Sequence, residues 1–173
     1  MIRLPRRLAR GALLVTAAAA VLLASAVLLA PAAPASATAP VVNLDCTVTV
    51  TTDVHPGVTT QLRHLAATSH GLTGTATCTG TINGQPVTGP GSFAVNNQAL
   101  GNCTQAIGAA TFVLKIPTAS ATETIAGRYT IHIPAAVPLT GDLTGTVAVV
   151  SAVGDCITTP ITQTTSVLTA HIT

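Results

Sequence analysis

Four cysteines carry the best-defined chemistry in this sequence: Cys46, Cys78, Cys103 and Cys156. Their spacings contain no C-x-x-C pair, which is the common arrangement of a zinc site, so we predict disulfide bonds and no bound metal. Of the three possible connectivities we favour Cys46–Cys78 and Cys103–Cys156. The first two cysteines each lie in an alternating, strand-like pattern, whereas the other two follow Gly-Asn and Gly-Asp in loop-like surroundings. Each bond would add about 4 kcal/mol of stability in the chain-entropy model.

Ionisable residues are few, and this scarcity restricts acid–base catalysis. Asp53 lies two residues before His55, so a small extracellular hydrolase would depend on this pair. The sequence contains neither the Gly-x-Ser-x-Gly nucleophile elbow nor an H-E-x-x-H metal motif. We therefore predict a protein that is not an enzyme and that carries no cofactor.

Threonine alternates with small or apolar residues from Leu72 to Ile82. Alternate residues of a strand share one face and lie about 6.6–6.8 Å apart, so this row could present hydroxyl and methyl groups to a polysaccharide. The simpler interpretation is the solvent-facing side of a strand, because threonine is polar and favours β-structure. Similar alternation recurs at residues 47–51 and 144–146. The candidate contact face consists of Thr73, Thr75, Thr77, Thr79 and Thr81.

The first 37 residues have the pattern of an export signal. Arginines at the start precede an apolar run over residues 11–30, and Ala35-Ser36-Ala37 provides a small-residue cleavage site. We predict cleavage after Ala37, a short linker over residues 38–42, and a single domain over residues 43–173. The mature chain would be secreted, with no membrane segment left after cleavage.

Removal of the signal peptide changes the charge of the protein. Four of the seven basic residues lie in the signal, which leaves three basic residues against five acidic ones and a net charge of −2. A nucleic-acid partner would lack electrostatic support in such a chain. Residues 38–173 contain thirty threonines and no tryptophan, so the core must be built from aliphatic side chains in strands.

Short alternating segments separated by turn residues predict an all-β domain. Asn83-Gly84 is a strong hairpin signal, and Pro86 restricts the returning arm to a sheet edge. We expect loops at residues 55–57, 96–106 and 138–142. Seven to nine strands at this spacing indicate a β-sandwich or a closed sheet. The expected strands cover residues 43–54, 58–67, 72–82, 109–116, 124–133, 143–153 and 161–172.

The stretch Ala126-Gly127-Arg128-Tyr129, which follows the segment 114–116, resembles the E-to-F corner of immunoglobulin-like domains. This resemblance covers about twenty residues and implies a Greek-key β-sandwich. The whole chain resembles the small, threonine-rich β-proteins that actinobacteria secrete, because it combines an Ala- and Arg-rich signal with threonine-rich strands and four scattered cysteines. That group has no assigned activity, so the likeness implies a compartment and a fold.

These observations lead to one expected function and two alternatives. We expect a secreted, non-enzymatic β-sandwich that acts by surface contact with the cell envelope, an extracellular matrix or a protein partner. The first alternative is a secreted protease inhibitor, since Streptomyces-type subtilisin inhibitors are similar in size, export and cysteine number; residues 96–106 would then form the reactive segment. The second alternative is a small extracellular hydrolase that uses Asp53 and His55.

Overall fold

The computed structural model describes residues 39–133 and 137–173. The predicted signal peptide, residues 1–37, lies outside the described residues. Residues Thr38–Thr173 form one compact unit. The two described stretches contain strands and turns, and they include no helix long and apolar enough to cross a membrane.

The all-β prediction is confirmed, with ten strands in place of the seven to nine expected. The boundaries of β9 and β10 agree with the alternating segments in the sequence, because both strands keep a regular pattern up to a turn. The strands are β1 Val42–Val58, β2 Arg63–Ser69, β3 Gly74–Ile82, β4 Gln85–Pro86, β5 Gly91–Gly101, β6 Ala106–Pro117, β7 Thr122–Ile133, β8 Val137–Gly141, β9 Leu143–Val153 and β10 Ile161–Ile172.

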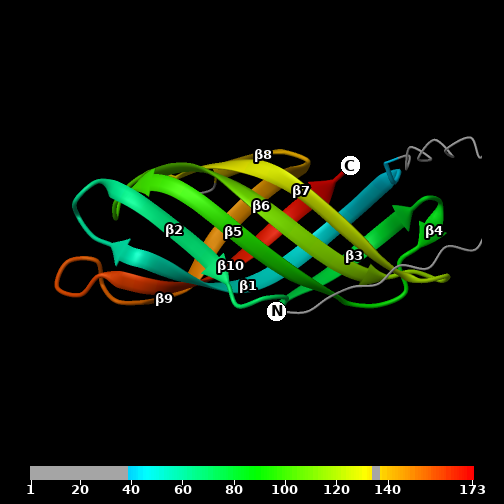
Figure 1. The fold of residues 1–173 in the computed structure, drawn as a ribbon, viewed down its shortest axis with the longest axis horizontal. Helices are drawn as coiled ribbons and strands as arrows, with labels where there is room; N and C mark the ends of the chain where they lie inside the picture. The colour runs from blue at the N-terminus through cyan, green and yellow to red at the C-terminus, as the bar shows by residue number, and fades with distance from the viewer. Residues whose placement is uncertain (1–38, 134–136) are drawn as a thin grey trace, which may run out of the picture. The chain divides into compact units, whose positions relative to one another are not determined.

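All ten strands belong to one antiparallel sheet that closes on itself. The strand order is β10-β9-β8-β7-β6-β5-β2-β1-β3-β4, and additional pairings join β10 to β1 and β5 to β3. β2 and β3 therefore share one position between β1 and β5, each pairing with a different part of both strands. In Figure 1, β5, β6 and β7 cross β1, β9 and β10 diagonally, as the tilted walls of a closed sheet do.

This pairing differs from the expected immunoglobulin-like sandwich, which has two separately bonded sheets. The long strands are bonded on both sides, so no free edge divides the structure into two sheets. The edge strand β4 has two residues and extends from β3 alone, as expected for an arm that contains Pro86. Asn83 and Gly84 form the preceding turn with positive φ angles of 51° and 76°.

Three expected loops are largely strand. Residues 96–101 belong to β5, where they pair with β2 on one side and β6 on the other, so polar side chains did not prevent strand pairing. Most of residues 138–142 form β8, which pairs with β7 and β9. The segment 55–57 lies within β1, and the pairing of β1 with β10 shifts register between Asp53 and Val58.

The packed core fills the half of the closed sheet that contains the Phe93–Phe112 pair. The two rings stack with their centroids 5.8 Å apart, and Phe112 also lies 6.2 Å from the Tyr129 ring. Cys46 and Cys78 face each other across β1 and β3 in this half and form a disulfide. The other large, fully buried side chains are Leu44, Val48, Ile82, Leu114, Ile116, Leu139, Leu143 and Ile172.

Truncation of the central ring tests this packing. We expect Phe112→Ala to lower the free energy of unfolding by about 3–5 kcal/mol, because a buried ring is lost and a cavity remains. Equilibrium unfolding in urea with both disulfides intact measures the loss. The control Val150→Ala removes an exposed side chain and should change stability by less than about 0.5 kcal/mol. Equal stability of the two variants would contradict the described core.

Candidate functional site

Inward-facing side chains become smaller along β5 and β6. The two strands are in direct register, and the paired inward residues run from Phe93–Leu114 and Val95–Phe112 to smaller pairs. The smaller pairs are Asn97–Ala110, Ala99–Gly108 and Gly101–Ala106. Because a closed sheet keeps its walls apart, small residues on facing positions leave space between them. The half of the interior beyond Phe112 is therefore hollow.

The hollow half contains a cavity of about 340 Å³. This volume is at the lower end of the range for small-molecule sites. Eight strands contribute to its wall, whereas β3, β4 and the start of β1 lie on the packed side. Val149 lines the cavity and is 55% exposed, which places this part of β9 at an opening. Apolar lining residues include Val50, Val54, Leu65, Ala67, Val95, Ala99, Ile131, Leu139, Val147, Ile161 and Leu168.

A few polar side chains interrupt this apolar wall. Thr52 and Thr164 share a hydrogen bond with their hydroxyl oxygens 3.1 Å apart. Asn97 also lines the cavity, and its Oδ1 atom is buried without a hydrogen-bond partner among the described residues. Ser166 and Tyr129 contribute hydroxyl groups. The described lining contains no carboxylate, imidazole, ammonium or guanidinium group.

Tyr129 is the single tyrosine of the chain and is 6% exposed. Burial raises the pKa of its hydroxyl to about 12, because the ionised form would lose its hydration. The hydroxyl is therefore neutral over the physiological pH range. The sequence around this residue resembles an immunoglobulin-like corner, whereas in the structure the residue forms part of the cavity wall.

The second disulfide links two turns at the hollow end. Cys103 lies in the turn between β5 and β6, lines the cavity and is bonded to Cys156 in the turn between β9 and β10. The backbone N–H of Cys103 donates to the carbonyl oxygen of Thr59 at 3.0 Å, which adds the connection after β1. The disulfide pairing is the one favoured from the sequence. Together, the disulfide and this hydrogen bond join three connections around one end of the cavity.

Asp155 organises the turn that carries Cys156. Its carboxylate accepts a hydrogen bond from the Thr158 hydroxyl and others from the N–H groups of Thr159, Thr158 and Ile157. These bonds, led by the one from the Thr158 hydroxyl, hold the pKa of Asp155 far below its usual value. The Asp155 carboxylate therefore stays ionised at neutral pH and keeps accepting these hydrogen bonds. They fix the conformation of the turn that carries Cys156.

The predicted threonine face exists and is wider than one strand. Thr75, Thr77 and Thr79 are exposed on the outer side of β3, Thr73 is exposed just before the strand begins, and Thr81 is half-buried. Pairing with β1, β10 and β9 extends the row across four strands. One transverse line consists of Thr77, Thr47, Thr169 and Thr146 in mutual register. Thr47 and Thr146 lie in similar alternating patterns of the sequence. Thr169 does not, and its place in the line depends on pairing between strands that are distant in the sequence.

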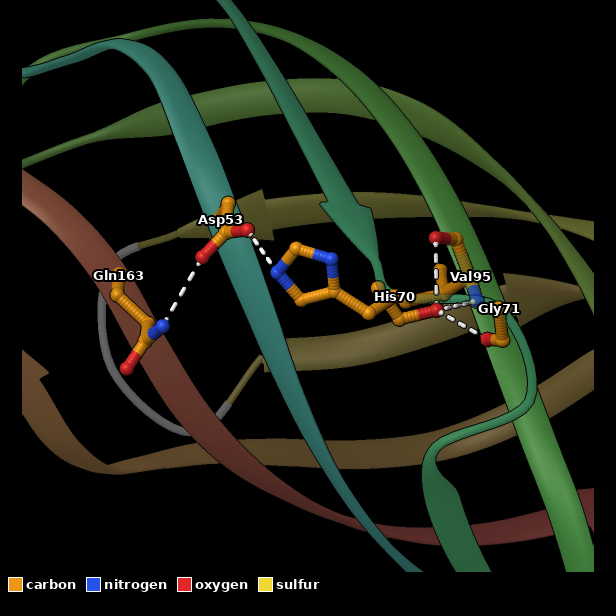
Figure 2. A network of polar contacts seen from close by, with 6 residues as sticks. Asp53, His70, Gly71, Val95 and Gln163 are labelled. Atoms are coloured by element: carbon orange, nitrogen blue, oxygen red, sulfur yellow. Dashed lines mark hydrogen bonds and ion pairs between the residues drawn. The ribbon is translucent and has the colours of Figure 1, made fainter.

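Asp53 contacts a different histidine from the one that the sequence suggested. In Figure 2 it lies between His70 and Gln163: its Oδ2 atom forms an ion pair with His70 Nε2, and Gln163 Nε2 donates to Oδ1 at 3.0 Å. The hydrogen bond from Gln163, followed by the charge of His70, holds the pKa of Asp53 below its usual value. The neighbouring Ser69 hydroxyl bonds to the backbone of Gly71 and Val95 (Figure 2).

This polar network differs in geometry from a catalytic triad. No hydrogen bond joins His70 to a serine, threonine or cysteine among residues 39–133 and 137–173. In the same stretches, no three histidine, cysteine or acidic side chains come together in a way that could hold a metal ion.

The segment suggested as a protease-inhibitory loop, residues 96–106, is mostly strand. The part outside the strands comprises residues 102–105, and the disulfide of Cys103 restrains it.

A spectroscopic titration tests the enclosure of Tyr129. Because the chain has one tyrosine and no tryptophan, absorbance at 295 nm follows this hydroxyl alone. We expect a midpoint of about 12 in the folded protein, against about 10 in urea. The folded pKa is the higher one, so the contribution to stability is complete below pH 10 and is lost as pH rises through 12. A folded midpoint near 10 would place the hydroxyl in bulk water and contradict an enclosed wall.

Comparison with protein families, with curated proteins and with solved structures finds no match to this chain.

Proposed function

We propose that this protein is a secreted, non-enzymatic binding protein that holds one small, mainly apolar molecule inside its closed sheet. The observation that supports the proposal is the cavity of about 340 Å³ with an apolar wall and a few polar groups. Closed sheets of about eight strands either fill their interior with side chains or hold one small ligand. Here one half is filled and the other half is hollow, so a packed base supports a binding chamber.

The proposed compartment rests on two features. The N-terminal sequence has the pattern of an export signal, and the described chain carries two disulfides, which persist in oxidising compartments. Binding without catalysis fits a lining whose one ionisable side chain is a tyrosine with a pKa of about 12. A wall of this composition provides shape and hydrogen bonds, and it provides no general acid or base at neutral pH.

A fluorescent probe tests the proposed function. N-phenyl-1-naphthylamine is neutral and apolar, and its emission rises when it leaves water. We expect saturable binding of one probe molecule per protein, and binding at least about tenfold weaker to Ala99→Leu, because the larger side chain occupies the cavity. Ala148→Leu makes the same change on the exposed side of β9 and should bind like the wild type.

Circular dichroism spectra should show that both variants are folded. If the wild type shows no saturable binding of this or any other neutral apolar probe, the proposed function is wrong. If Ala99→Leu binds like the wild type, the probe binds outside the cavity.

The threonine face supports a second candidate function, contact with a polysaccharide or cell-envelope surface. The specific observation is the line Thr77, Thr47, Thr169 and Thr146, which carries the row of β3 across three further strands. Its surroundings hold few ionisable groups: Asp45 Oδ1 and His171 Nδ1 form a hydrogen bond at 2.9 Å, two residues from Thr47 and Thr169 along the strands. Such a surface offers hydroxyl and methyl groups at the spacing of strands, about 4.8 Å.

Co-sedimentation with washed cell walls and insoluble polysaccharides tests this candidate. The variant carries Thr47→Ser, Thr77→Ser and Thr169→Ser, which removes three methyl groups and keeps the hydroxyls. We expect binding to fall at least about threefold if the face makes the contact, since lost methyl contacts weaken apolar packing. The control carries Thr111→Ser, Thr122→Ser and Thr124→Ser, which are exposed on β6 and β7. Equal sedimentation of variant and control would rule out the face as the contact surface.

A further inference from the structure

Asn97 is the polar residue of the cavity whose buried hydrogen-bonding atom is left unsatisfied. On β5 it stands between Ala67 of β2 and Ala110 of β6, in register with both. These small neighbours leave open space beside the asparagine side chain. Its Oδ1 atom is the one buried side-chain oxygen or nitrogen without a hydrogen-bond partner in the part of the chain that the structure describes.

The other polar side chains of the wall either have a hydrogen-bond partner or can rotate to find one. Thr52 and Thr164 bond to each other. The hydroxyls of Tyr129 and Ser166 can rotate and can act as donors or acceptors, so a water molecule or a ligand can satisfy them in several ways. A buried amide oxygen without a donor is unfavourable, and natural proteins leave few such atoms. Asn97 is therefore the place in the wall where a bound molecule would gain most from a hydrogen bond.

The amide can present its oxygen to the cavity. Asn97 as a whole is half-buried and lines the cavity, while its Oδ1 atom is covered by neighbouring atoms. The torsion about the Cβ–Cγ bond of asparagine has broad, roughly two-fold preferences. A half-turn therefore brings the oxygen to the cavity and places the Nδ2 group against the covering atoms, without a movement of the strand. A ligand with an O–H or N–H group could thus meet the oxygen from inside the cavity.

The wall also selects against charge. The described lining contains no group of opposite sign for an anion or a cation, and Tyr129 stays neutral up to about pH 12. An ion in this chamber would lose its hydration without a charged partner, which is strongly unfavourable. A neutral molecule loses much less hydration on entry.

We propose that the cavity takes a neutral, mainly apolar molecule with one hydroxyl or N–H group that donates a hydrogen bond to the Asn97 amide oxygen. This inference rests on the proposed binding function and adds the chemical class of the ligand. The apolar wall supplies most of the affinity, and Asn97 sets which end of the molecule points toward β5.

Three probes with one carbon skeleton test this assignment. N-phenyl-1-naphthylamine has an N–H group, 1-phenoxynaphthalene has an ether oxygen in its place, and 8-anilinonaphthalene-1-sulfonate adds a negative charge. The amine is titrated by fluorescence, and the other two are measured by displacement of the amine. We expect wild-type protein to bind the amine about tenfold more tightly than the ether, which is about 1.4 kcal/mol, and the sulfonate at least tenfold more weakly than the amine.

The variant Asn97→Leu replaces the amide by an apolar group of similar size. We expect its amine-to-ether ratio to fall to about one, and its melting temperature to equal or exceed that of the wild type, because an unpaired buried oxygen is removed. The control Asn96→Leu changes the neighbouring, exposed asparagine and should keep the wild-type ratio.

The outcomes separate this inference from the proposed function. If none of the probes binds the wild type, the binding function itself is wrong. If the probes bind and the amine-to-ether ratio of the wild type is one, or the ratio is unchanged in Asn97→Leu, the cavity binds ligands but Asn97 does not select them. Binding of the sulfonate as tight as that of the amine would overturn the requirement for a neutral ligand. A strongly lowered melting temperature of Asn97→Leu would mean that the protein satisfies the amide itself, which also overturns the inference.

Discussion

The structure depends on one constraint, the closure of a single sheet around side chains of unequal size. Closure by the β1–β10 and β5–β2/β3 pairings holds the walls apart at a distance set by the number and tilt of the strands. The walls cannot collapse locally where residues are small. Bulky residues such as Phe93 and Phe112 therefore fill one half, whereas Asn97, Ala99 and Gly108 leave the other half open. In an open sheet the same small residues would allow a covering layer to move inward, and no chamber would remain.

The two disulfides lie in different halves of the closed sheet, one in the packed half and one at the hollow end. Cys46–Cys78 joins neighbouring strands inside the packed half, where the surrounding core already holds β1 and β3 together. Cys103–Cys156 joins turns at the hollow end, where side-chain packing between the walls is missing. A covalent link restricts the unfolded chain and also holds these turns at a defined separation. We infer that the second bond supports the shape of the chamber more than the first, since fewer buried contacts could take its place.

Local sequence patterns predict much of this fold, and their failures have a common cause. Regular alternation identifies β9 and β10, and Asn83-Gly84 identifies a hairpin turn, because both signals depend on neighbouring residues. Residues 96–101 look like a loop because Asn96, Asn97 and Gln98 are polar. Two of these side chains face solvent and the third lines the cavity, so their polarity reflects positions along a strand and not a turn. The decrease in side-chain size along β5 and β6 is present in the sequence, yet its meaning depends on the register between the strands and on closure.

The alternation of strands also explains how one sequence can provide two independent surfaces. Along β1, even-numbered residues from Leu44 to Val54 face inward, and odd-numbered residues such as Thr47 and Thr49 face outward. A change in one set therefore leaves the composition of the other set untouched, and the sheet backbone separates the chamber from the threonine face. The scarcity of charge affects both surfaces in the same way, because each offers shape, apolar contact and neutral hydrogen bonds to a binding partner. Hydrogen bonds are less screened in an enclosed cavity than on an exposed surface, so under the proposed function the unpaired Asn97 amide would distinguish ligands more strongly than the exposed threonine row.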